Sequence, residues 1–213
     1  MKIILMGAPG SGKGTQAELL MDHLGIPHIS TGEIFRENMK KKTQLGQKAG
    51  EYIVKGLLVP DEVTCEMLFD RLEDDDCKGG FILDGFPRTI NQAQILDNYL
   101  NQKGYEIDKV VNIDIPDESV IRRLSGRRVC SICSTTYHVE YDKPKKEGVC
   151  DSCHSPLIQR KDDSPETIKA RLVTYHESSE PLIGYYKQKC RLAVVDGTRD
   201  INEISQDIIA LLG

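Results

Sequence analysis

The sequence predicts an α/β fold in which a parallel five-stranded sheet carries helices on both faces. Short apolar runs, typical of buried strands, alternate along the chain with longer stretches of helical periodicity. A glycine-rich segment, residues 7–15, connects the first strand to the first helix. The stretch 127–163 interrupts the alternation, and we therefore interpret it as an insertion into the sheet domain.

The N-terminal elements follow from simple patterns. Lys2–Met6 is a short apolar run that a glycine ends, as expected of a buried strand, and Lys13–Leu24 is helical in pattern up to Gly25, a typical helix-ending residue. A second short strand and two helices are predicted next, at His28–Ser30, Gly32–Lys41 and Gly46–Lys55. Strands that alternate with helices in this way imply a parallel sheet covered on both faces.

Start signals mark most of the later helices. Pro60-Asp61 begins a helix that runs to about Glu73, and the helix Asp117–Ser125 has its acidic residues in the first turn, where they favour the helix dipole. Ser164 is a capping residue followed by proline, and Asp200 with Glu203 resembles a capping box for the last helix. The other predicted elements are the helix Ile90–Gln102 and the strands Phe81–Asp84, Val110–Ile115 and Leu192–Val195.

The composition excludes several functional classes. The 28 basic and 33 acidic residues give a formal net charge of −5, whereas proteins that coat nucleic acids or anionic membranes are usually basic. No apolar run is long enough for a signal peptide or a membrane span. Seven cysteines without a secretion signal favour free thiols and metal binding in a reducing compartment. We expect a cytoplasmic protein with no nucleic-acid or membrane partner, and, since no extra apolar face is evident, a monomer.

The glycine-rich segment Gly7–Thr15 (GAPGSGKGT) predicts a phosphate-binding loop. It lies between a strand and a helix, where its glycines allow backbone N–H groups to face an anion and Lys13 adds a full positive charge. In the common motif a hydroxyl residue directly follows the lysine, but here Gly14 precedes Thr15, which weakens the case for direct magnesium ligation by Thr15. A dinucleotide-type turn is disfavoured, because the glycine spacing differs and no acidic residue ends the second strand.

Further motifs extend along most of the chain: STGEIFR at Ser30–Arg36, GLLVPDE at Gly56–Glu62, DGFPRT at Asp84–Thr89, SGRR at Ser125–Arg128 and RKDD at Arg160–Asp163. With them the sequence resembles the adenylate kinases of the bacterial long-lid type, with Glu33 in place of an expected aspartate. The resemblance implies a P-loop nucleoside monophosphate kinase fold in three parts. These are a core of residues 1–29, 60–126 and 164–213, an AMP-binding insert at 30–59, and a zinc-binding lid at 127–163.

The resemblance also implies an activity, the reversible transfer of a phosphoryl group between ATP and AMP to give two ADP, with Mg²⁺ accompanying ATP. The implied AMP site comprises Thr31, Arg36, Leu57, Leu58, Val59, Gly85, Phe86, Pro87, Arg88, Gln92, Arg160 and Arg171. The implied ATP site comprises Gly10, Ser11, Gly12, Lys13, Gly14, Thr15, Arg127, Thr136, Tyr137 and Arg199. The implied catalytic set is Lys13, Arg88, Arg123, Arg160 and Arg171, and Asp84 would hold magnesium through water. Arginine suits this chemistry, because its planar guanidinium binds phosphate oxygens and keeps its proton.

Four cysteines in two C-x-x-C pairs, Cys130, Cys133, Cys150 and Cys153, have the spacing of a four-thiolate zinc site. Such a site has no open coordination position, so its zinc would be structural and would hold together a short polar segment that cannot build a core. His138 and His154 are alternative ligands, and a pair of disulfides is the alternative to metal. Arginines on both sides of the segment suggest a flap that closes over ATP and excludes water.

Other questions stay open at this level. A kinase for UMP or CMP is the nearest alternative, and a P-loop protein that binds nucleic acid through a zinc ribbon is a more distant one, with Lys143–Lys146 in its favour. Asp162 and Asp163 either cap a helix or pair with the arginines, and whether they are catalytic or structural stays open. Cys65 is expected to lie in a helix and to be a small residue of the protein core. Cys77 and Cys190 show no pattern that indicates a role.

Overall fold

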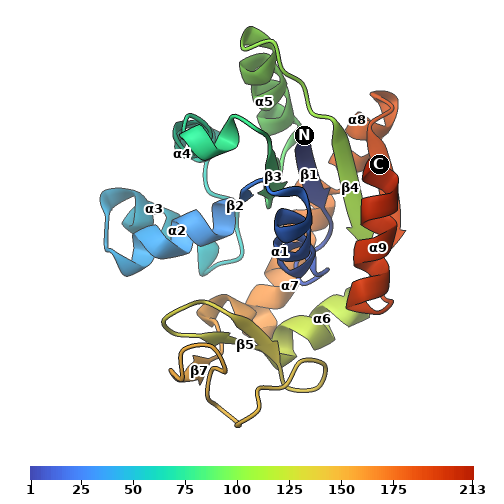
Figure 1. Ribbon diagram of the computed structural model, residues 1–213. Helices are drawn as coiled ribbons and strands as arrows, with labels where there is room; N and C mark the ends of the chain where they lie inside the picture. The colour runs from blue at the N-terminus through green and yellow to red at the C-terminus, as the bar shows by residue number, and fades with distance from the viewer.

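The computed structural model describes residues 1–213, and a five-stranded parallel sheet lies at its centre (Figure 1). The strand order is β2-β3-β1-β4-β8. The strands are β1 (Lys2–Met6), β2 (His28–Ser30), β3 (Phe81–Asp84), β4 (Lys109–Asp114) and β8 (Leu192–Asp196). All four neighbouring pairs are parallel, which confirms the predicted fold class.

Helices cover both faces of this sheet. They are α1 (Lys13–Leu24), α4 (Asp61–Leu72), α5 (Ile90–Gln102), α6 (Asp117–Gly126), α7 (Pro165–Thr174), α8 (Pro181–Gln188) and α9 (Ile201–Leu212). Alternate residues of β1 point to opposite faces, so Ile4 joins the core beneath α4, α5 and α8, while Ile3 joins the core beneath α1 and α9. Both residues are fully buried. None of the helices is at once long and apolar enough to cross a membrane.

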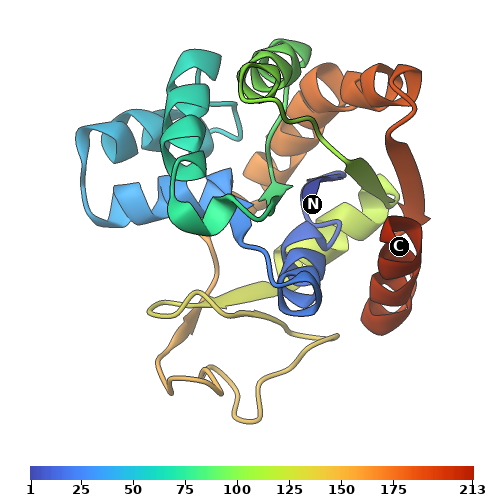
Figure 2. The ribbon, with the colours of Figure 1, turned by 45° about the horizontal axis from the view of Figure 1, so that its top comes forward.

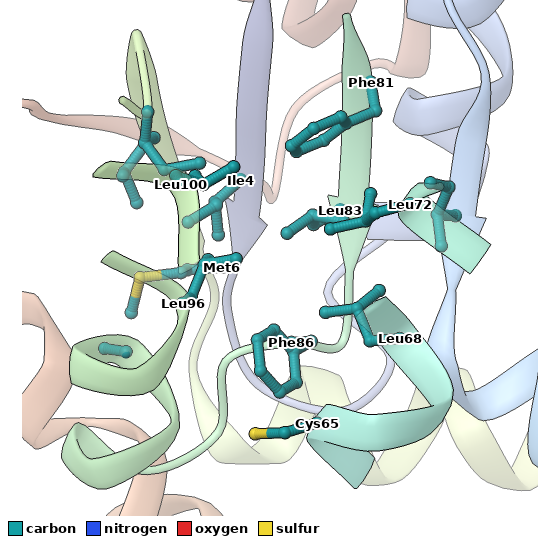
Figure 3. Close-up of a cluster of buried hydrophobic side chains, with 14 of the residues drawn as sticks. Ile4, Met6, Cys65, Leu68, Leu72, Phe81, Leu83, Phe86, Leu96 and Leu100 are labelled. Carbon is teal, nitrogen blue, oxygen red and sulfur yellow. The ribbon is translucent and has the colours of Figure 1, made fainter. Parts of the chain in front are cut away.

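The larger core cluster sets the position of β3 and of the segment that follows it. Figure 3 shows Phe81 and Leu83 of β3 packed with Ile4 of β1 and Leu68 of α4. Phe86 lies between α4 and α5. Cys65 lies in the same cluster, which confirms the prediction that it is a core residue. Because Phe86 is only 1% exposed, it anchors the chain directly after the end of β3.

Two segments extend from the sheet domain (Figures 1 and 2). Residues 30–59, here called the insert, contain α2 (Thr31–Lys40) and α3 (Gln44–Ile53), which pack against each other. Residues 127–163, here called the lid, contain a second sheet of order β6-β5-β7, made of β5 (Arg127–Cys130), β6 (Thr136–His138) and β7 (Leu157–Ile158). The sequence pattern does not predict these three strands.

The C-terminal part confirms two predicted helix starts and adds features that the sequence pattern did not predict, α8 among them. Ser164 caps α7 by accepting a hydrogen bond from the Thr167 amide, and Asp200 caps α9 by accepting one from the Asn202 amide. The capping bond of Asp200 therefore goes to the second helical residue and not to Glu203. Between α7 and α8 the chain forms a π-helical turn, Tyr175–Ser179, and short 3₁₀ turns lie at Asp75–Cys77 and Lys161–Asp163.

Candidate active site

The phosphate-binding loop connects β1 to α1 at the carboxyl edge of the sheet. Gly7, Gly10 and Gly12 have positive φ angles of 139°, 78° and 102°, which favour glycine. A Cβ on Gly7 would lie 2.4 Å from the carbonyl oxygen of Ile113, so no larger residue fits there. No side chain caps the start of α1. Its first amides therefore remain available to an anion.

Lys13 lies across this loop. Its Nζ donates to the carbonyl oxygens of Gly7 and Ala8, both at 2.8 Å, and to Ser11 Oγ at 3.3 Å. Burial lowers the pKa of Lys13 to about 8, with Asp84 opposing the shift and Arg88 adding to it. No carboxylate pairs with this buried ammonium ion, which is held by two carbonyl oxygens and a hydroxyl group and can exchange them for phosphate oxygens.

Asp84 ends β3 beside the start of α1. His28 Nε2 on the neighbouring strand lies 3.5 Å from Asp84 Oδ2, and both side chains are largely buried. Burial alone would raise the pKa of Asp84, but His28 and the charge of Lys13 outweigh it and lower the pKa. An ionised carboxylate at this place fits the oxygen-ligand preference of magnesium. The sequence did not indicate His28, whose position depends on the pairing of β2 with β3.

An open pocket lies between the insert and the sheet domain. It is lined by nine of the twelve residues predicted for the AMP site: Thr31, Arg36, Leu57, Leu58, Val59, Gly85, Arg88, Gln92 and Arg171. The other three lie outside the lining, with Phe86 in the core. Phe35 and Thr64, which the sequence did not indicate, and Asp162, whose role it left open, also line the pocket. The tertiary structure thus brings together segments that are far apart in the chain.

Arginine side chains dominate one side of this region. Arg36, Arg88 and Arg160 have no carboxylate within salt-bridge distance; Arg88 instead donates from Nε to the Gly85 carbonyl oxygen at 2.8 Å. Burial lowers the pKa of all three, and Arg36 adds to the shift in the other two. Cations that burial and mutual repulsion destabilise are expected to gain from a bound polyanion.

Two neighbouring aspartates neutralise other arginines of the same group. Asp163, whose side chain is fully buried, binds Arg127 at 2.6 Å and Arg171 at 3.3 Å, and Asp162 binds Arg171 at 3.0 Å. Burial would raise the pKa of Asp162, but Arg171 and Arg127 lower it overall. Both aspartates therefore pair with arginines, one of the two arrangements that the sequence left open.

Arg123 of the predicted catalytic set and the residues predicted for the ATP site are less tightly grouped. Arg123 donates to the carbonyl oxygens of Ser11 at 3.2 Å and Gly197 at 2.7 Å, so it lies against the phosphate-binding loop. Arg199 pairs with Asp207 of α9. In the lid Thr136 is exposed, whereas the Tyr137 side chain is buried with its hydroxyl group 3.5 Å from Cys150 Sγ. A contact of Tyr137 with ATP stays a prediction.

The four lid cysteines form one cluster, with all four sulfur atoms within 4.8 Å of one another. The closest pairs, Cys130–Cys153, Cys133–Cys153 and Cys133–Cys150, are 3.3–3.5 Å apart, well beyond the length of about 2.0 Å of a disulfide bond. A tetrahedral zinc site needs sulfur separations of about 3.8 Å, so the set fits zinc with a small adjustment. Neither His138 nor His154 belongs to the cluster.

The lid and the insert contact each other. Lys40 Nζ at the end of α2 donates to the carbonyl oxygen of Ser131 in the lid at 3.3 Å. The same two segments bring arginines together. Besides burial, Arg127 of the lid lowers the pKa of Arg36 in the insert, and Arg36 lowers the pKa of Arg160 in the lid. The arginines therefore converge from both segments toward the edge of the sheet where Lys13 lies.

Comparisons with known proteins agree with this geometry. The family model described as adenylate kinase matches residues 5–191. The adenylate kinase of Caldicellulosiruptor bescii is 55% identical over 213 residues, which is all of this chain and 99% of that protein. The adenylate kinase of Clostridium acetobutylicum is 54% identical with the same coverage. The chain belongs to the adenylate kinase family, whose members are phosphotransferases with a phosphate group as acceptor.

Proposed function

We propose that the protein catalyses the reversible reaction ATP + AMP ⇌ 2 ADP. The observation that carries this proposal is the position of the arginine-lined pocket beside the phosphate-binding loop. Two anion sites at one edge of a sheet allow two nucleotides to approach each other with their phosphates in line. The loop residues Gly10–Thr15 would bind the ATP phosphates, while Arg36 and Arg88 would hold the phosphate of AMP.

In this proposal the chemistry is charge neutralisation and positioning. Lys13, Arg123, Arg160 and Arg171 would surround the transferred phosphoryl group with positive charge, which stabilises its equatorial oxygens. Magnesium, when bound with ATP, neutralises phosphate charge, and Asp84 is the carboxylate placed to hold it through water. The pairing of Asp162 and Asp163 with arginines would keep these cations in position before a substrate binds.

The lid would close over ATP and exclude water. Zinc held by the four cysteines would keep the lid folded and take no part in the transfer, because four thiolates leave no position for a substrate. The lid is small and polar, and its hydrophobic cluster has only three buried residues, Cys130, Tyr137 and Cys150. In the proposal two of these are zinc ligands. The contact of Lys40 with Ser131 supports a closing motion toward the insert. We further propose the core, insert and lid as three parts of a cytoplasmic monomer.

Steady-state assays with separate acceptors test the function. ADP formation from ATP is measured with AMP, GMP, CMP or UMP as the second substrate, at saturating Mg²⁺. We expect AMP to have the highest kcat/KM by about a hundredfold or more, since the pocket positions one base and one phosphate. Preference for UMP or CMP would overturn the assignment of AMP. Salt-sensitive binding of an oligonucleotide without kinase activity would instead favour the zinc-ribbon alternative.

A further inference from the structure

Gln92 is held in one orientation at the wall of the pocket. It lies in the first turn of α5, its residue is 1% exposed, and its backbone amide donates to the capping Thr89 Oγ1 at 3.0 Å. The side-chain oxygen Oε1 accepts a hydrogen bond from the Arg88 amide at 2.7 Å. The side-chain nitrogen Nε2 donates to Asp61 Oδ1, also at 2.7 Å. Both ends of the carboxamide group are therefore engaged.

These two partners permit only one orientation of the carboxamide. A backbone N–H can only donate, and an ionised carboxylate can only accept. Rotation of the carboxamide by 180° would place its NH₂ group against the Arg88 N–H and its oxygen against the Asp61 carboxylate. Two part-buried hydrogen bonds would become two repulsive contacts, which is strongly unfavourable for a buried side chain such as Gln92.

Asp61 is itself fixed by its second oxygen. Asp61 Oδ2 accepts from Thr89 Oγ1 at 3.0 Å and from Asn91 Nδ2 at 2.8 Å. Asp61 is also the first residue of α4, where the helix dipole favours a negative charge. The carboxylate thus joins the start of α4 to the start of α5, and it reaches the pocket only through Gln92, since it is absent from the pocket lining.

The fixed carboxamide leaves one N–H and one oxygen lone pair for a ligand. An amino group next to an unprotonated ring nitrogen, as in adenine, presents the complementary donor and acceptor. A 6-oxopurine presents the reverse order, an acceptor oxygen next to a ring N–H. A carboxamide that turns freely adapts to either base, whereas one that is held in place rejects the reversed pattern.

We propose that Asp61 is a positioning residue that sets the preference of the pocket for a 6-aminopurine over a 6-oxopurine monophosphate. The proposal rests on the proposed function, because it concerns the base of the same acceptor nucleotide. Asp61 acts only through Gln92. Its removal should therefore change discrimination between bases more than it changes the rate with the correct base.

AMP and IMP provide the test, since their bases differ only by the exchange of the 6-amino group and ring nitrogen for a 6-oxo group and ring N–H. The ratio of kcat/KM for AMP to that for IMP is measured with saturating ATP. For Asp61→Ala and Asp61→Ser we expect the ratio to fall about tenfold, through a higher KM for AMP and a lower one for IMP, with KM for ATP unchanged. Serine is included because its hydroxyl group either donates or accepts and so does not fix the carboxamide.

Two further variants separate positioning from a merely structural role. Asp61→Asn keeps a carbonyl oxygen that can accept from Gln92, so we expect an AMP/IMP ratio within about threefold of the original. Asn91→Ala removes one exposed partner of Asp61 Oδ2 but leaves Thr89 on that oxygen and Gln92 on the other, so it should leave the ratio unchanged. Thermal melts of each variant show whether it is folded.

The outcomes are distinguishable. If the unaltered protein turns over AMP but folded Asp61→Ala and Asp61→Ser keep its AMP/IMP ratio, the positioning role is wrong while the proposed function stands. An equal loss of kcat/KM for both nucleotides also overturns the positioning role. If the unaltered protein does not phosphorylate AMP, the proposed function itself fails, and the inference fails with it.

Discussion

Arg127 and Asp163 form a two-point ion pair between the first strand of the lid and its last turn. Arg127 donates from Nε to Asp163 Oδ2 at 2.9 Å and from Nη2 to Oδ1 at 2.6 Å. The Asp163 side chain is completely buried, and 15% of the Arg127 side chain is exposed. The pair closes the base of the lid, because the two residues lie at opposite ends of the inserted segment.

Asp163→Asn tests this pair. The variant keeps the shape of the side chain but leaves the charges of Arg127 and Arg171 without their buried partner, so we expect a loss of about 3 kcal/mol in the free energy of unfolding, measured by urea denaturation. Asp162→Asn is the matched control. Asp162 pairs only with Arg171, and 13% of its side chain is exposed against none of the Asp163 side chain, so its loss should be smaller. Equal effects of the two variants would contradict this ranking.

Gly46 marks the crossing of α2 and α3. A Cβ at Gly46 would lie 2.2 Å from the backbone carbonyl group of Asn38, which cannot move without shifting α2. We therefore expect Gly46→Ala to lower the melting temperature and to raise KM for AMP by about tenfold, since overpacking typically costs 1–3 kcal/mol. KM for ATP should stay the same, because ATP would bind outside the insert.

Gly50→Ala in the same helix is the control for Gly46→Ala. A Cβ at Gly50 would meet only the flexible Met39 side chain, with its Cε at 3.3 Å. Alanine also favours the helix by about 1 kcal/mol relative to glycine. The variant should therefore keep KM for AMP and the melting temperature, and a defect like that of Gly46→Ala would refute the argument from close packing.

Removal of the proposed zinc should lower thermal stability more than it lowers the turnover of molecules that remain folded. We expect chelation, or Cys133→Ser, to lower the melting temperature by several degrees, because metal binding supplies folding free energy to a segment with little core. Cys190→Ser, at an exposed cysteine outside the cluster, should have no such effect. An unchanged melting temperature after complete chelation, with metal loss verified by elemental analysis, would rule out a structural role.

His176 makes the stability of the protein depend on pH. Its ring nitrogens lie 2.8 Å from Glu180 and 3.0 Å from Asp117, and these hydrogen bonds raise the pKa of His176. A raised pKa means that the stabilisation is fully present below the ordinary histidine value of about 6.5 and is lost as pH rises through the raised value. His176→Gln should therefore lower the melting temperature at pH 5.5 but not at pH 9.

The size of this effect is limited by solvent. Because 42% of the His176 side chain is exposed, we expect less than about 1 kcal/mol, or a shift of roughly 2–4 °C in the melting temperature. Glu180→Gln should reproduce part of the loss at pH 5.5. A difference between His176→Gln and the unaltered protein that is the same at both pH values would contradict a charge-based origin.

Local patterns were enough to predict the five strands of the sheet domain and all of its helices except α8. Buried parallel strands such as Lys2–Met6 are continuous apolar runs, and helix ends carry capping residues such as Ser164, so neighbouring residues determine both. The phosphate-binding loop and the four-cysteine cluster were predicted for the same reason, since fixed spacing within a short segment defines each of them. Boundaries differed where signals were weak: α3 begins at Gln44, two residues before the predicted start.

The sequence by itself determined the fold class, the family and the residue types of the site, because these depend on short-range patterns. Only the tertiary structure decided the partners: Asp61 holds Gln92, His28 faces Asp84, and Arg127 binds Asp163. These contacts join residues 31, 56 and 36 positions apart, and no local periodicity records them. The short strands of the lid were missed for a related reason. The short strands His28–Ser30 and Phe81–Asp84 were recognised because they alternate with helices, whereas the lid strands lie in an irregular polar segment and only their pairing with one another defines them.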